Sequence, residues 1–239
     1  MPALPSHEFS PGLSLRGIAP PLKLSDFRLI AFDMDSTLIN IECVDEIAAA
    51  AGRKAEVAAI TEAAMRGEIA DYKESLRRRV SLLKGVPLSA LQQVWDQRLQ
   101  LNPGAETLVR ACQAAGLKTL LVSGGFTWFT DRVRDRLGID DTRSNVLEVA
   151  DGVLTGRMVD QPWGDICDGD EKKRMLLSTC ERHGIAPAQA IAMGDGANDL
   201  PMMSVAGLSV AYHAKPKVRE QAMVAIDEGG LDRLLEVLK

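Results

Sequence analysis

The sequence predicts an α/β protein built on a parallel β-sheet with helices on both faces. Short apolar runs, among them Arg28–Phe32, Lys118–Ser123 and Ala190–Gly194, alternate with helical patterns, and each of these runs ends abruptly at polar or glycine residues. Strands of a parallel sheet are apolar throughout because helices cover both of its faces. The chain has 239 residues, 46% of them hydrophobic, so it can bury a full core without disulfides or a structural metal.

Residues 1–27 precede the first strand and are predicted to form a loose, proline-rich arm. They hold five of the eleven prolines and lack the basic start and apolar run of a secretory signal. No stretch of the chain approaches the roughly 18 to 20 uncharged apolar residues of a membrane span. The net charge of -5 does not suit nucleic-acid binding, and the four cysteines lack C-x-x-C spacing. We expect a cytoplasmic protein that binds neither membranes nor nucleic acids.

Four helical patterns follow the first strand with no strand between them. They extend over residues 44–51, 54–66, 72–84 and 88–100. Such a run is typical of an insertion into an α/β domain. We therefore predict a catalytic core of residues 28–41 and 102–239 and a helical insertion of residues 42–101.

Beyond the insertion the alternation of strands and helices resumes. The strand 118–123 breaks at Gly124-Gly125 into a helix over 127–137, and Asp151-Gly152 predicts the turn of a hairpin over 145–158. A helix over 171–183 leads to the strand 190–194, and strands at 208–212 and 224–227 complete the sheet. Ligands of such sheets bind beyond the carboxyl ends of the strands, where Asp33, Ser123 and Asp195 are expected to meet.

The first candidate motif is Asp33-Met34-Asp35, directly after a buried strand. Most D-x-D triplets are solvated turns, but the position at a strand end favours a catalytic reading. Asp33 is ionised at neutral pH and suits nucleophilic attack on phosphorus. Asp35 suits the transfer of a proton to the leaving group and later from water, provided that its surroundings raise its pKa.

The second motif is Gly194–Asp199, after the third strand. Its G-x-G resembles a dinucleotide fingerprint, but the third glycine is missing and an aspartate would face the phosphate, which excludes NAD. Asp33 and Asp195 at adjacent strand ends offer the hard oxygen ligands that Mg²⁺ prefers, with Asn198 and Asp199 orienting them.

Two further segments supply groups that bind anions. Ser123-Gly124-Gly125 combines a hydroxyl with backbone amides before a helix, although most such triplets are simple turns. Glu171-Lys172-Lys173-Arg174 is mostly a solvated helix face, but one lysine is needed to neutralise phosphoryl oxygens beside so many acids.

The chain resembles the haloacid-dehalogenase (HAD) superfamily of phosphatases. The four signatures of that superfamily occur in order as Asp33/Asp35, Ser123, Lys172 and Asp195/Asp199, and the resemblance extends from about residue 29 to 217. Six stretches are similar to the superfamily members that act on phosphoserine: FDMDSTLINIECVDEIA, AMRGE, SLRRRVSLLKG, LVSGGFTWF, GDGANDLPM and AYHAKPKV. The resemblance implies a Rossmann-like core, a helical cap, Mg²⁺, and hydrolysis of O-phospho-L-serine to L-serine and phosphate, the last step of serine biosynthesis.

The resemblance also implies roles for individual residues. Glu42 would meet the serine ammonium group and Arg79 the serine carboxylate, while Met65 and Tyr72 would close over the substrate. Ser123, Gly124 and Asn198 complete the substrate-binding set. Lys172, chosen over Lys173 by its spacing to Asp195, would act in catalysis. The metal would be bound by Asp33, Asp195 and the backbone carbonyl of Asp35, supported by Asp199.

Two alternative functions stay open at this point. A related phosphatase or a phosphotransferase that passes the phosphoryl group to homoserine would carry the same motifs. A receiver-type signalling module also has a phosphorylatable aspartate on a parallel sheet. Asp35 and the helical insertion argue against the receiver, because a signalling aspartate needs a long-lived phosphoryl group and no adjacent acid or lid.

Overall fold

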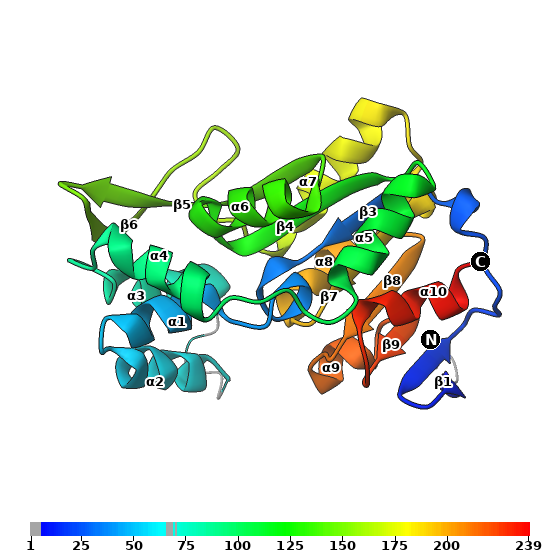
Figure 1. Ribbon diagram of the computed structural model, residues 1–239, viewed down its shortest axis with the longest axis horizontal. Helices are drawn as coiled ribbons and strands as arrows, with labels where there is room; N and C mark the ends of the chain where they lie inside the picture. The colour runs from blue at the N-terminus through cyan, green and yellow to red at the C-terminus, as the bar shows by residue number, and fades with distance from the viewer. Residues whose placement is uncertain (1–5, 66–68, 70) are drawn as a thin grey trace.

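In a computed structural model, which describes residues 6–65, 69 and 71–239, nine strands form one sheet in the order β1-β2-β9-β8-β7-β3-β4-β5-β6 (Figure 1). The six central strands, from β9 to β5 in this order, run parallel to one another, whereas β1, β2 and β6 pair antiparallel at the two edges. Their bounds are β1 Ser6–Ser10, β2 Leu13–Arg16, β3 Leu29–Phe32, β4 Lys118–Phe126, β5 Asp141–Ala150, β6 Val153–Val159, β7 Ala190–Gly194, β8 Leu208–Tyr212 and β9 Val224–Ile226. The predicted fold class is confirmed.

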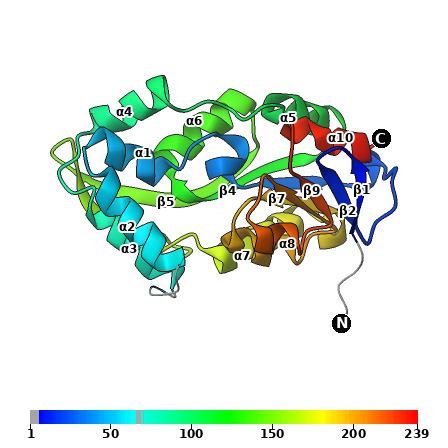
Figure 2. The ribbon, with the colours of Figure 1, turned by 90° about the horizontal axis from the view of Figure 1, so that it is seen from below.

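Helices cover both faces of the sheet, as Figure 2 shows. On one face α5 (Ala105–Ala114), α6 (Thr127–Leu137) and α10 (Leu234–Val237) pack on a core that includes Ile30 and Phe32. On the other face α7 (Gly169–His183), α8 (Leu200–Met203) and α9 (Pro216–Arg219) pack on Leu29 and Ala31. Side chains alternate between the two faces along a strand, so each apolar strand contributes to both cores.

The helical insertion consists of α1 (Cys43–Ala50), α2 (Lys54–Met65), α3 (Tyr72–Ser81) and α4 (Leu88–Gln97), which lie together at one end of the molecule (Figures 1 and 2). The β5–β6 hairpin extends from the sheet toward them. Its backbone bonds to the α3–α4 connection through Gly85 N–H to Leu154 O (2.8 Å) and Leu154 N–H to Val86 O (2.8 Å). The insertion is therefore attached to the core at a point remote in sequence from its own ends.

The prediction of a loose arm is wrong for residues 6–16. They form the hairpin β1–β2, and β2 pairs with β9 with Leu13 opposite Ile226 and Leu15 opposite Val224. Both leucines are fully buried. The prediction failed because Pro11, Pro20 and Pro21 all lie outside the two strands and because the partner strand is more than 200 residues away in sequence.

Two other local predictions differ from the structure. The strand expected to break at Gly124 continues as β4 to Phe126, with an irregular register between Val122 and Phe126. No helix was predicted for Ala105–Ala114, although its buried residues, Ala105, Leu108, Val109 and Cys112, follow the helical i, i+3, i+4, i+7 spacing. Among the described residues, no helix is long and apolar enough to cross a membrane.

Candidate active site

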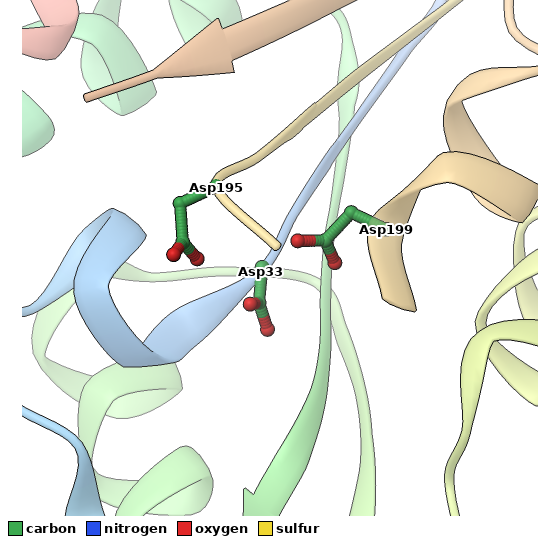
Figure 3. A group of neighbouring side chains, drawn as sticks. All are labelled: Asp33, Asp195 and Asp199. Carbon is green, nitrogen blue, oxygen red and sulfur yellow. The ribbon is translucent and has the colours of Figure 1, made fainter. Parts of the chain in front are cut away.

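Three aspartates gather where β3 and β7 end. These strands are parallel neighbours with Phe32 opposite Met193, and the Asp33 N–H donates to Met193 O over 2.9 Å. Asp33 and Asp195 therefore follow adjacent strand ends, and the turn 197–199 returns Asp199 to them. Figure 3 shows the three carboxylates, whose nearest oxygen atoms all lie within 4.8 Å of one another.

Lys172 on α7 contacts two of these three aspartates. Its side chain is fully buried, with Nζ 2.7 Å from Asp33 Oδ1 and 2.6 Å from Asp199 Oδ1. Lys173, the neighbour that the sequence left as an alternative, is only half-buried on α7. Burial by itself lowers the pKa of Lys172, but the carboxylates of Asp199 and Asp33 raise it well above its ordinary value. Lys172 therefore stays charged.

Asp199 has both carboxylate oxygens engaged by the protein. Oδ1 contacts Lys172, and Oδ2 accepts a hydrogen bond from the Gly196 N–H over 3.0 Å. Asp33 and Asp195 are thus the carboxylates more available to a cation, while Asp199 contacts Lys172 and the Gly196 N–H.

The electrostatics at these carboxylates fit a cation site. Burial and the charge of Asp199 raise the pKa of Asp33 well above its ordinary value, although Lys172 opposes the shift. Burial, Asp199 and Glu42 raise the pKa of Asp195 to about 7. A divalent cation would relieve this repulsion and return both carboxyls to the ionised form. The donor set therefore suits a hard metal ion.

Asp35 lies in the turn 34–38, where Ser36 has a φ of 57°. Asp35 Oδ2 accepts a hydrogen bond from the Cys43 N–H over 3.2 Å, while Oδ1 is buried and has no hydrogen-bond partner in the part of the chain that the structure describes. Burial and the charge of Glu42 raise the pKa of Asp35 to about 7. Asp35 can therefore hold or release a proton near neutral pH, which is the property that the sequence analysis required of it.

Ser123, Gly124 and Gly125, which we call the anion cradle, lie at the end of β4. Ser123 is fully buried, and its Oγ accepts a hydrogen bond from the Gly125 N–H over 2.8 Å. The hydroxyl of Tyr72 on α3 reaches this point: a Cβ added to Gly124 would lie 2.0 Å from Tyr72 Oη. A side chain at position 124 would collide with the insertion, so glycine permits the close approach.

One cavity of about 870 Å³ joins these groups to the helical insertion. Its lining includes the predicted residues Asp33, Asp35, Glu42, Tyr72, Arg79, Ser123, Gly124, Asp195 and Asn198. Ser36 Oγ donates to Glu42 Oε1 over 2.7 Å, and Arg79 Nε is buried without a hydrogen-bond partner among residues 6–65, 69 and 71–239. The side chain of Met65 lies outside the described part of the chain.

Sequence reasoning overlooked several groups at or beside this cavity. Thr37 is fully buried beside it, with Oγ1 3.5 Å from Asp195 Oδ1, and it stands at the fifth position of the D-x-D-x-T signature that begins at Asp33. Asp45 lines the cavity one turn of α1 after Glu42. Lys215 also lines it, and the Lys215 N–H donates to Asp195 O over 3.1 Å. The D-x-D-x-T pattern was a signal for Thr37, and the helical spacing was one for Asp45.

The fold and the site are those of a hydrolase of the HAD type, and the chain belongs to the family of haloacid dehalogenase-like hydrolases, whose model matches residues 30–204. The resemblance proposed from the sequence is therefore confirmed.

Several relatives and solved structures that are similar to this chain are phosphoserine phosphatases. The phosphoserine phosphatase of Polaromonas sp. strain JS666 is 78% identical over 97% of this chain and 98% of the relative. That of Albidiferax ferrireducens is 74% identical over 96% of this chain and 97% of the relative. A solved phospho-aspartyl intermediate analogue of phosphoserine phosphatase superposes with a TM-score of 0.81 at 38% identity, covering 89% of this chain and 99% of that one. A substrate-bound phosphoserine phosphatase gives 0.82 at 37% identity, with the same coverage.

Proposed function

We propose that this chain hydrolyses O-phospho-L-serine to L-serine and phosphate through a phosphoaspartate on Asp33. The observation that carries the proposal is one cavity that joins two sets of groups. Asp33, backed by Lys172, supplies phosphoryl chemistry on the core side, while Glu42 and Arg79 supply opposite charges on the insertion side. An amino acid phosphate carries the complementary charges. The names and high identities of the relatives support the same activity.

The proposed metal is Mg²⁺, held by Asp33, Asp195 and the backbone carbonyl of Asp35, with Asp199 in support. When bound, it would offset negative charge on the phosphoryl oxygens and on the acids around them. Lys172, which contacts Asp33, would add a second positive charge at the attacking carboxylate. The Ser123 hydroxyl and the Gly124 amide would donate hydrogen bonds to the phosphoryl group.

Proton transfer is assigned to Asp35. Asp33 would attack phosphorus while Asp35, protonated, donates its proton to the departing serine oxygen. Asp35 is then ionised and would take a proton from the water that hydrolyses the phosphoaspartate. A pKa of about 7 suits both roles, because neither protonation state is strongly disfavoured at neutral pH.

Recognition of the serine part is assigned to the helical insertion. Arg79 on α3 presents a planar, bidentate donor for the substrate carboxylate, and its buried Nε has no hydrogen-bond partner in the described chain. Glu42 would bind the ammonium group. Tyr72 over the anion cradle, Met65 and Asn198 would enclose the substrate and exclude water. Residues 42–101 would then act as a cap on a core of residues 28–41 and 102–239.

A phosphate-release screen over small phosphorylated metabolites tests the proposal. The expected result is Mg²⁺-dependent release from O-phosphoserine, absent in Asp33→Asn and retained in Asp160→Asn, an exposed control. Adding homoserine and assaying for phosphohomoserine distinguishes hydrolysis from transfer. Substantial turnover by Asp33→Asn would exclude Asp33 as the nucleophile. Activity of this kind would place the chain at the last step of serine biosynthesis, a cytoplasmic pathway.

A further inference from the structure

Asn145 on β5 links the anion cradle to the segment that leads into α7, but it does not line the cavity. Its side chain is 1% exposed, its Nδ2 donates to Gly124 O over 2.8 Å, and its Oδ1 accepts from the Cys167 N–H over 2.8 Å. Because one partner is a backbone carbonyl and the other a backbone N–H, the orientation of the amide is fixed by its surroundings. A buried amide satisfied at both ends is costly to replace.

The bond to Gly124 controls the anion cradle. Gly124 C=O and Gly125 N–H are the two ends of a single peptide group. Asn145 binds the carbonyl end, and the N–H end donates to Ser123 Oγ over 2.8 Å. Since Ser123 Oγ accepts this bond, its own hydrogen remains free to donate elsewhere. The peptide held by Asn145 thereby sets the direction of the Ser123 hydroxyl.

The bond to Cys167 controls the approach to α7. Cys167 directly precedes Asp168, whose side chain caps α7 by accepting from the Glu171 N–H over 2.9 Å. Lys172 follows in the first turn of that helix. Arg143, two residues before Asn145 on the same face of β5, forms an ion pair with the buried Glu171. Strand β5 thus holds the helix that presents Lys172.

From this geometry we propose that Asn145 is a positioning residue for phosphoryl transfer, which sets the anion cradle and the start of α7 relative to each other. It acts through Ser123 and Lys172 and does not contact the substrate. This inference rests on the proposed phosphatase function. Groups that bind a transition state must be held to within fractions of an ångström, and displacement by about 1 Å costs on the order of 100-fold in rate.

Two variants remove either one or both of the hydrogen bonds that the Asn145 side chain makes. Asn145→Asp keeps an acceptor for Cys167 but loses the donor to Gly124, whereas Asn145→Ala loses both and introduces no charge. Ser144→Ala is the matched control, because Ser144 is buried on the opposite face of the same strand. This variant loses the 2.7 Å hydrogen bond between Ser144 and Thr130 on α6. All three variants remove buried polar contacts, but the control leaves the cradle intact.

The readouts are kcat and KM for O-phosphoserine and p-nitrophenyl phosphate, inhibition constants for inorganic phosphate and L-serine, and the melting temperature. Both Asn145 variants should lose roughly 10- to 100-fold in kcat, equally on the two substrates, because both substrates carry the same phosphoryl group. Inhibition by phosphate should weaken and inhibition by L-serine should not change. Ser144→Ala should have a lower melting temperature than the wild type, but its kcat should stay within about twofold of the wild-type value.

Three results would overturn the inference. One is a kcat for Asn145→Ala close to that of the wild type at a temperature where both are folded. Another is a loss confined to phosphoserine with weaker L-serine binding, which would assign Asn145 to substrate selection. Failure of the wild-type chain to hydrolyse either substrate would refute the proposed function, and the inference with it.

Discussion

Replacing Asp195 by asparagine should stabilise the metal-free chain at neutral pH and remove its response to Mg²⁺. Burial, Asp199 and Glu42 raise the pKa of Asp195 from 3.8 to about 7. A carboxyl with a raised folded-state pKa stabilises the fold fully only below its unfolded pKa, and this contribution is lost as the pH rises through its folded pKa. The relevant window therefore extends from about pH 4 to about pH 7, above which the metal-free fold carries an ionised Asp195 among other acids.

The size of the effect follows from the shift. About three pKa units correspond to at most about 4 kcal/mol, and partial exposure of Asp195 to solvent reduces this figure. About 1.5 kcal/mol of this destabilisation of the fold is already present at pH 5, which lies roughly one unit above the pKa of Asp195 in the unfolded chain. The unfolding free energy of Asp195→Asn minus that of the wild type should therefore increase by up to about 2.5 kcal/mol between pH 5 and pH 8.

Urea unfolding in EDTA at pH 5, 6, 7 and 8, repeated with Mg²⁺, measures this difference. Mg²⁺ should stabilise the wild type more at pH 8 than at pH 5, because protons compete for the carboxylates, and should have little effect on Asp195→Asn. Asp160→Asn, at an exposed position, controls for the loss of one charge. A difference that does not change with pH, or a variant that still responds fully to Mg²⁺, would refute the reasoning.

Three further predictions concern other parts of the molecule. Arg79→Ala should lower kcat/KM for O-phosphoserine by about 100-fold and for p-nitrophenyl phosphate only slightly, since only the first has a carboxylate; equal losses would contradict this role. Asp35→Asn should slow phosphoserine by on the order of 10²- to 10⁴-fold but p-nitrophenyl phosphate much less, because p-nitrophenolate leaves without a proton; a uniform loss would exclude the acid role. Leu15→Ala should cost about 2–5 kcal/mol of stability, against under about 0.5 for the exposed Phe9→Ala, as denaturant unfolding would show; similar values for the two would mean that β2 is not part of the core.

The sequence predicted the elements whose signals are local. An apolar run followed by an acid marks β3 and β7 whatever surrounds them, because a parallel strand is buried on both faces along its whole length. The hairpin turn at Asp151-Gly152 was equally local, since both residues adopt positive φ values of 51° and 78°. The helices of the insertion followed from their apolar spacing in the same way.

The candidate site was predictable to the extent that strand ends of a parallel sheet meet at one edge. That rule alone brings Asp33, Asp195 and Ser123 together. The spacing that favoured Lys172 did not establish its contacts, which depend on how α7 packs. The roles of Glu42 and Arg79 came from resemblance and stay predictions until substrates are tested.

The sequence by itself thus determined most of the strands and helices from β3 onward, though not α5, and the residues at the strand ends, because each depends on neighbours a few positions away. Tertiary structure decided the rest. The β1–β2 hairpin needs β9, the amide of Asn145 needs Gly124 and Cys167, and the raised pKa values of Asp35 and Asp195 need charges and burial that folding creates. Pairing energies and the local dielectric environment arise only when segments distant in sequence come into contact.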